Sequence, residues 1–297
     1  MPTLVVITGP TGVGKTEAAI EAALHLGCDI VNADSRQVYR DIPIGTAAPT
    51  DEQQQRVTHH MVACKSLDET YSAWQYEQDV MDLLPQLWAK GDYVVMCGGS
   101  MMYIDAVCNG IDALPDINAD VRQAVLEQYE QQGLRPLLEE LQQCDPDYFN
   151  QVDRRNPRRV LHAVEICRQA GVPYSTLRTG HKRERPFSIV KVALNLPRPE
   201  LFDRINRRVD TMMEHGLLEE AHSVYPMRHH NSLNTVGYKE LFAYFDGRMT
   251  LDVARERMKK NTRVYAKKQL TWLARDPHLT WCTPSETISV IEENLKI

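Results

Sequence analysis

Short apolar runs alternate with longer segments of helical composition along most of this chain, and the alternation predicts an α/β fold. Four runs have the β-branched composition of buried parallel strands, at residues 4–8, from residue 29, at 93–97 and at 189–195. The segments that follow them predict helices over about 17–24, 72–90, 101–108 and 198–215. A long helix from about Thr250 to Arg275, a short strand at 279–282 and a last helix complete the pattern. Strands that alternate with helices form a parallel sheet covered on both faces.

Residues 113–182 interrupt this alternation. Pro115, Gly133, Pro146 and Pro157 separate short helical segments, and no strand pattern occurs between them. We therefore expect a P-loop-type parallel sheet core from residues 1–112 and 183–297, flanked by helices, with an all-helical insertion domain at 113–182.

The first run leads into a glycine-rich motif, Gly-x-x-x-x-Gly-Lys-Thr, and then into a helix. In this context the backbone N–H groups converge on an anion, the helix N-terminus adds partial positive charge, and Lys15 adds a full charge. Thr16 is placed to hold a Mg²⁺ ion that bridges phosphates. The motif predicts a di- or triphosphate site made of Gly9, Pro10, Thr11, Gly12, Val13, Gly14, Lys15 and Thr16.

Two further loops follow strands and are expected at the same edge of the sheet, where ligands of open α/β folds bind. Asp34 follows the second run. Phosphate repels a carboxylate, so a carboxylate at this place is expected to bind Mg²⁺ or to accept a proton from a substrate. A helix N-cap formed with Ser35 is the alternative. Gly98-Gly99-Ser100 follows the third run, where ATPases and GTPases commonly place an acidic residue. Two glycines suit the close approach of a ligand or a base edge.

The net charge of −6 hides two unlike halves. Residues 1–150 carry 8 Lys+Arg and 23 Asp+Glu, a net −15, and residues 151–297 carry 26 and 17, a net +9. The basic half favours a polyanionic partner larger than one phosphate, although solvated helix faces would give the same count. Arg204 and Arg208 lie four residues apart and can clamp a diphosphate or form surface salt bridges. The long helix interleaves Tyr265 and Trp272 with eight cations, as nucleic-acid-binding surfaces do.

The seven cysteines are odd in number and scattered, and no Cys-x-x-Cys pair occurs. This spacing argues against a disulfide framework and a zinc site, and it favours a reducing cytoplasmic environment. No apolar run approaches the length of a membrane span, and the N-terminus leads directly into a strand, so we expect neither a signal peptide nor a membrane partner.

Seven motifs occur in a fixed order: Gly9–Thr16, Asn32–Tyr39, Ile44–Ala47, His59-His60, Tyr71–Ala73, Gly98–Ser100 and Val236–Lys239. With the helical insertion, this ordered set resembles the bacterial tRNA dimethylallyltransferase (isopentenyl-tRNA transferase) family over essentially the whole chain. The resemblance implies transfer of a dimethylallyl group from dimethylallyl diphosphate to N6 of adenosine 37, just 3′ of a tRNA anticodon. It also implies release of diphosphate, a requirement for Mg²⁺, and binding of the tRNA anticodon stem-loop, and we expect a monomer.

The resemblance carries roles for individual residues. Asp34, Thr11 and Arg208 would be catalytic: Asp34 would take the proton of the adenine amine, while Thr11 and Arg208, with Lys15, would stabilise the departing diphosphate. Arg204 would join the P-loop residues in the diphosphate site, and Thr16 would bind the metal ion. The tRNA-binding set would be Asp34, Ser35, Arg36, Gln37, Ser100, Arg122, Arg158, Arg159, Val160, Leu161, His162, Asn234, Thr235, Val236, Gly237, Tyr238 and Lys239.

Two positions depart from the family pattern. Ser100 stands where threonine is usual and keeps the hydroxyl, whereas Asn234 stands where some members are basic. Three other functions remain open from the sequence: an adenylate isopentenyltransferase that uses a free nucleotide, a P-loop small-molecule kinase, and a non-catalytic P-loop RNA-binding protein. Saturable, salt-sensitive binding of tRNA, transfer of phosphate from ATP, and the effect of Asp34→Ala separate these functions.

Overall fold

A computed structural model describes residues 1–180 and 182–297 of the chain. The chain divides into two compact units, one formed by Met1–Cys108 with Glu184–Ile297 and the other by Asn109–Arg183. Residue 181, inside the predicted insertion, lies outside the described residues.

The first unit contains a six-stranded parallel sheet, which confirms the predicted fold class. Its strands are β1 (Thr3–Thr8), β2 (Ile30–Asn32), β3 (His59–His60), β4 (Tyr93–Cys97), β5 (Ser188–Leu194) and β6 (Thr280–Cys282). They lie in the order β3-β2-β4-β1-β5-β6. β1 is therefore central, and the loops that follow β2, β4 and β1 emerge side by side at one edge of the sheet.

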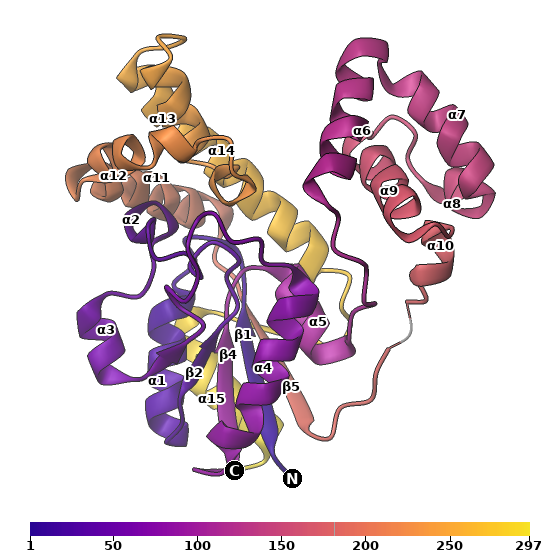
Figure 1. The fold of residues 1–297 in the computed structure, drawn as a ribbon. Coiled ribbons are helices and arrows are strands. Elements are labelled where there is room, and N and C mark those ends of the chain that lie inside the picture. The colour runs from indigo at the N-terminus through magenta and orange to yellow at the C-terminus, as the bar shows by residue number, and fades with distance from the viewer. Residues whose placement is uncertain (181) are drawn as a thin grey trace. The chain divides into compact units, whose positions relative to one another are not determined.

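Helices cover both faces of this sheet, which explains why β1 is apolar throughout (Figure 1). Val5 and Ile7 pack in one cluster with α1 (Lys15–Leu26) and α15 (Thr287–Leu295). Leu4 and Val6 pack in another with α4 (Ala73–Trp88) and α5 (Met101–Asn109). All four side chains have 0% exposure, and burial of each contributes about 1.5–3 kcal/mol relative to leaving it in water.

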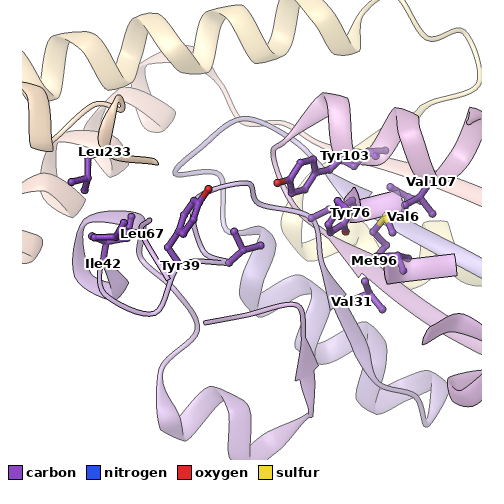
Figure 2. Close-up of a cluster of buried hydrophobic side chains, with 14 of the residues drawn as sticks. Val6, Val31, Tyr39, Ile42, Leu67, Tyr76, Met96, Tyr103, Val107 and Leu233 are labelled. Atoms are coloured by element: carbon purple, nitrogen blue, oxygen red, sulfur yellow. The ribbon is translucent and has the colours of Figure 1, made fainter. Parts of the chain in front are cut away.

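The cluster under α4 and α5 extends beyond the sheet toward the loops that follow β2 (Figure 2). Within it, the rings of Tyr76 and Tyr103 stack with their centroids 4.0 Å apart. The Tyr76 hydroxyl donates a hydrogen bond of 2.9 Å to the carbonyl of Asn32 at the end of β2. Tyr39, in the loop after β2, belongs to the same cluster. This packing holds the start of that loop against α4 and α5.

The remaining helices of the first unit come mainly from the C-terminal part of the chain. They are α2 (Pro43–Thr46), α3 (Asp51–Arg56), α11 (Arg198–Glu214), α12 (Leu217–Ser223), α13 (Tyr238–Phe245) and α14 (Leu251–Leu273), with short 3₁₀ turns at Tyr225–Met227, Asn231–Leu233 and Pro284–Glu286. α14 packs on both α11 and α13. Arg255 and Lys259 of α14 share Asp210 of α11 in ion pairs of 2.6 and 2.9 Å.

The described residues of the second unit form helices and connecting loops, without a strand. It contains α6 (Ala119–Gln132), α7 (Leu134–Cys144), α8 (Pro146–Gln151), α9 (Pro157–Ala170) and α10 (Tyr174–Leu177). Its own core includes Val125, Leu137, Leu141 and Val160, all with 0% exposure. The buried carboxylate of Asp145 accepts hydrogen bonds from the backbone of Tyr148 and from Ser175, which fixes α8 and α10 together.

All seven cysteines are free thiols. Across residues 1–180 and 182–297, every helix is too short or too polar to cross a membrane.

Candidate active site

Three of the predicted motifs meet at the carboxyl edge of the sheet. The loops after β2 and β4 are joined backbone to backbone, since Ala33 N donates to Cys97 O at 2.7 Å and Ser100 N donates to Ala33 O at 3.0 Å. The Thr8 hydroxyl at the end of β1 donates to Gly98 O at 3.1 Å. The P-loop (Gly9–Thr16), the Asp34 loop and the Gly98–Ser100 turn therefore form one continuous rim.

The P-loop passes into α1 through Gly14, which caps the helix with φ of 105° and ψ of 22°. This left-handed conformation favours glycine. The Lys15 ammonium donates 2.9 Å to the carbonyl of Pro10, inside its own loop. Burial lowers the Lys15 pKa to about 8, and the neighbouring Arg208 cation adds to this lowering, while Asp34 opposes it. The loop thus concentrates positive charge, which the Asp34 carboxylate partly offsets.

α11 places two arginines against this loop. A Cβ on Gly14 would lie 2.9 Å from Arg204 Nη2, and a Cβ on Gly12 would lie 2.8 Å from the Ile205 side chain. One helical turn later, Arg208 Nη2 donates to Thr46 O at 3.4 Å. Burial lowers the Arg208 pKa and the Asp34 carboxylate raises it. The structure therefore brings both arginines of the predicted clamp to the P-loop.

Asp34 lies at the centre of this arrangement. Its Oδ1 accepts the N–H of Arg36 at 2.9 Å, which holds the carboxylate in a local turn. Within the described chain, no other group donates a hydrogen bond to this carboxylate, so Oδ2 can accept one from a ligand.

The neighbours of Asp34 in the predicted tRNA-binding set form hydrogen bonds with other parts of the chain. Arg36 donates to the carbonyls of Asn231 and Ser232 at 3.1 and 3.0 Å. Gln37 donates its amide to the carbonyls of Thr46 and Ala47 at 3.1 and 2.9 Å. Both side chains thus tie this loop to other segments of the first unit. Ser35 and Ser100 remain partly exposed at the rim.

A glutamate from α12 fixes the α2 segment on which Arg208 and Gln37 rest. Glu220 accepts the N–H groups of Ile44 and Gly45 at 2.7 and 2.8 Å, and it accepts the Tyr238 hydroxyl at 2.5 Å. Tyr238 itself is fully buried. The sequence suggested an RNA contact for Tyr238, whereas in the structure its side chain supports this scaffold.

The turn that holds Tyr238 has both exposed and buried members. Asn234 and Lys239 are exposed, Thr235 and Val236 are partly exposed, and Gly237 is buried. Gly237 N donates to Glu240 at 2.8 Å, and Asn261 of α14 donates to the same carboxylate at 2.6 Å. Asn234 and Lys239 are therefore the side chains that this turn presents to solvent.

In the second unit, four of the predicted RNA contacts are exposed side chains: Arg122 on α6, and Arg158, Arg159 and His162 on α9. The α9 arginines lie in its first turn, where Asn156 caps the helix by accepting the Arg159 N–H. Leu161 is partly exposed and packs on the core of this unit, and Val160 belongs to that core with 0% exposure. Val160 therefore offers no side-chain surface to a ligand in this conformation.

Three more residues reach the rim: Tyr265, which the sequence places on a nucleic-acid-binding helix, and Gln269 and Tyr103, which the sequence does not predict there. Gln269 of α14 is 2% exposed and binds both the P-loop and the Gly98–Ser100 turn. Tyr103 and Tyr265 each interact with Asp34, and burial raises the pKa of both phenols, that of Tyr265 to about 12. Of the two residues that were not predicted, Gln269 left a local signal: it occupies a buried position of α14 between Ala266 and Leu273, where an apolar residue is expected.

A separate cavity of about 540 Å³ lies outside this set of residues. Its lining includes Arg198, Phe202, Lys267 and Trp281. None of the predicted site residues lines it, so the rim described above is the candidate active site.

Comparisons with known proteins identify the family. The sequence model of the IPP transferase family matches residues 37–276, which is more than half of the chain. The chain belongs to this family. This membership confirms the resemblance seen in the sequence motifs.

Curated relatives cover nearly all of the chain. It is 57% identical to tRNA dimethylallyltransferase 2 of Parabacteroides distasonis over 290 residues, 98% of this chain and 97% of that protein. It is 52% identical to tRNA dimethylallyltransferase 1 of Bacteroides thetaiotaomicron over 292 residues, 98% of this chain and 95% of that protein.

Solved structures of the family share the fold. The full-length tRNA isopentenylpyrophosphate transferase of Bacillus halodurans superposes with a TM-score of 0.73 at 34% identity, over 100% of this chain and 96% of that one. A eukaryotic dimethylallyltransferase acting on tRNA superposes with a TM-score of 0.76 at 26% identity, over 92% of this chain and 70% of that one.

Proposed function

We propose that this protein transfers the dimethylallyl group of dimethylallyl diphosphate to N6 of the adenosine at position 37 of tRNA and releases diphosphate. One observation carries the proposal: in a member of the IPP transferase family, the P-loop lysine, the Arg208 guanidinium and the Asp34 carboxylate interact at a single rim. Cations that can hold a leaving anion thus lie beside a base that can take a proton.

The P-loop side supplies the leaving-group site. As the allylic C–O bond breaks, negative charge grows on the departing diphosphate, and fixed positive groups stabilise that charge without reorganisation. Lys15, Arg208 and Arg204 are the cations that the structure gathers around Gly9–Thr16, and Thr11 adds a partly exposed hydroxyl. A diphosphate that departs intact needs no acidic residue after β4 to organise an attacking water. The turn after β4, Gly98-Gly99-Ser100, contains no acidic residue.

The Asp34 side supplies the acceptor site. An exocyclic adenine amine is a weak nucleophile, so its orientation matters as much as removal of its proton. Oδ2 of Asp34 accepts a hydrogen bond from the amine and takes its proton as the new C–N bond forms. Ser35 and Ser100, both partly exposed at this rim, are the hydroxyls within reach of the edge of the base.

The target adenine must leave its stack in the RNA, because the site lies in a crevice at the edge of the sheet that a stacked base cannot enter. Exposed cations suit an anticodon stem-loop: Arg122, Arg158 and Arg159 of the second unit, and Lys239 of the first. We also propose that the protein acts as a monomer.

A magnesium ion fits the diphosphate site. Thr16 presents a hydroxyl oxygen in the first turn of α1, and hydroxyl and carboxylate oxygens are hard ligands. No cluster of three or more His, Cys, Asp or Glu side chains in residues 1–180 and 182–297 could form a complete protein cage. A single hydroxyl ligand from the protein suits Mg²⁺, which keeps several water ligands and binds substrate phosphates. When bound, the ion would neutralise charge on the diphosphate; Thr16 would hold it.

The test is incubation of the purified protein with dimethylallyl diphosphate and an unmodified tRNA transcript, followed by nucleoside mass analysis. We expect one N6-dimethylallyladenosine per tRNA, and none when guanosine replaces the adenosine at position 37. Prenylation of free adenylate but not of tRNA would identify the free-nucleotide enzyme. Consumption of ATP without prenylated RNA would identify a kinase.

A further inference from the structure

Gln269 occupies an unusual place for a glutamine. It lies near the C-terminal end of α14 with 2% exposure, and its side chain reaches out of the helix to two loops. Its Oε1 accepts the Thr11 N–H at 2.8 Å, and its Nε2 donates to Gly99 O at 2.9 Å. One amide group therefore spans the P-loop and the turn after β4.

In the proposed reaction, the two loops that Gln269 joins would bind different substrates. Thr11 lies in the loop that would hold the diphosphate, and Gly99 lies in the turn that precedes Ser100 and packs against the Asp34 loop. Both atoms that Gln269 binds are main-chain atoms, so the bonds fix the loops themselves and not merely side-chain rotamers.

The Gln269 amide also has little free space around it. A Cβ on Gly99 would lie 2.6 Å from Gln269 Nε2 and 3.7 Å from Lys15 Nζ. A methyl group there would push the amide from its place, while its contact with Lys15 would be ordinary. Glycine at position 99 and glutamine at position 269 are thus a matched pair.

We propose that Gln269 is a positioning residue that sets the distance between the leaving-group loop and the acceptor side of the active site. The inference rests on the proposed function for the identity of these two sides. Gln269 touches neither reacting group; it acts through Thr11 and Gly99. A displacement of about 1 Å between reacting groups lowers a rate on the order of 100-fold, so loss of this brace reduces turnover more than it reduces binding.

The test replaces Gln269 with methionine, which has a similar length but neither hydrogen-bonding atom. We expect the single-turnover rate of prenyl transfer to fall on the order of 100-fold. The dissociation constant for inorganic diphosphate should rise by at most about tenfold, since only one support of the loop is lost. Rates are expressed per site that binds diphosphate, so unfolded protein does not contribute.

The control is Gln86→Met, the same chemical change at an exposed position of α4. It should leave both measurements as in the wild type. A second variant, Gly99→Ala, tests the matched pair while Gln269 stays in place. In the otherwise wild-type protein, Gly99→Ala should lower the rate of transfer. In the Gln269→Met background it should lower the rate by less than about a further threefold, because the flexible end of the methionine can move aside.

A rate per binding site within about threefold of wild type for Gln269→Met would overturn the inference. Full additivity of Gly99→Ala and Gln269→Met would do the same. If Gln269→Met does not fold, Gly99→Ala decides the question alone, with Gly91→Ala as its control, because a Cβ at Gly91 has open space. Absence of any transfer by the wild-type protein would refute the proposed function and, with it, this inference, whereas an unimpaired variant of an active wild type would refute the inference alone.

Discussion

The Asp34 carboxylate interacts electrostatically with the Arg208 guanidinium: burial lowers the pKa of Arg208, and the carboxylate offsets part of this lowering. The two residues are far apart in the sequence, Asp34 in the loop after β2 and Arg208 in α11. A free carboxylate oxygen and a cation at one rim can serve two steps at once, removal of a proton and stabilisation of an anion.

Replacement of Asp34 tests the first of these steps. Asp34→Asn keeps an oxygen that can accept the Arg36 N–H but removes the base, so we expect kcat to fall about 100- to 10,000-fold. The tRNA dissociation constant should change by less than about threefold, because phosphate contacts supply most of that affinity. Asp41→Asn, at an exposed position after the same loop, serves as the control. Turnover of Asp34→Asn equal to that of Asp41→Asn would remove Asp34 from the chemistry.

Replacement of Arg208 tests the second step. Arg208→Ala removes a preorganised cation from the departing diphosphate, and kcat/KM for dimethylallyl diphosphate should fall on the order of 100- to 1,000-fold. Arg207→Ala, one residue earlier on α11 and exposed, keeps the same helix and should behave like wild type. Steady-state kinetics with the donor varied at saturating tRNA measures the effect. Equal kinetics for the two variants would place the diphosphate elsewhere.

The lowered pKa of Lys15 predicts a pH dependence of donor binding. In the free protein Lys15 is protonated below about pH 8 and neutral above it. Binding of dimethylallyl diphosphate should therefore weaken as the pH rises through 8, approaching about tenfold per pH unit. Calorimetry from pH 7 to 9.5 measures this slope. Lys15→Arg carries a charge that does not titrate in this range, so its curve should stay flat; the same slope in both proteins would assign the titration to another group.

The buried contact between Gly45 and Tyr238 predicts a loss of stability. A methyl group at position 45 would overlap the Tyr238 hydroxyl, so Gly45→Ala should lower the free energy of unfolding by about 1–3 kcal/mol. Gly91→Ala, where the added atom has open space, should change it by less than about 0.5 kcal/mol. Urea unfolding provides the measurement. Two ring carbons of Tyr238 also lie 2.6 and 2.8 Å from the added Cβ, so the Gly45→Ala cost should shrink in a Tyr238→Leu background, which lacks the hydroxyl and these carbons. An unchanged cost would show that another contact is responsible.

The sequence predicted the parts of the site that follow strands. Apolar runs located β1, β2, β4 and β5, and parallel strands deliver the residues after them to one edge. Asp34, Lys15 and Ser100 could therefore be grouped from the amino-acid sequence alone. β3 carried no such signal, because a two-residue edge strand, His59-His60, buries no apolar run of its own.

The supports of the site could not be predicted in this way. Gln269 is separated from Thr11 by 258 residues and Glu220 from Ile44 by 176, and no local pattern reports a contact at that distance. The motif Val236–Lys239 drew attention to Tyr238 as an RNA contact, yet burial of its ring and the bond to Glu220 account for a tyrosine there. Local periodicity specifies which elements form; tertiary packing decides which polar side chains brace them.

A crystal structure with an unreactive analogue of dimethylallyl diphosphate and an anticodon stem-loop RNA tests most directly whether one rim holds both substrates. We predict the diphosphate on Gly9–Thr16 with Arg208 bound to it, and the adenine N6 within about 2.6–3.2 Å of Asp34 Oδ2. A diphosphate in the cavity lined by Phe202 and Trp281, or an adenine remote from Asp34, would contradict this arrangement.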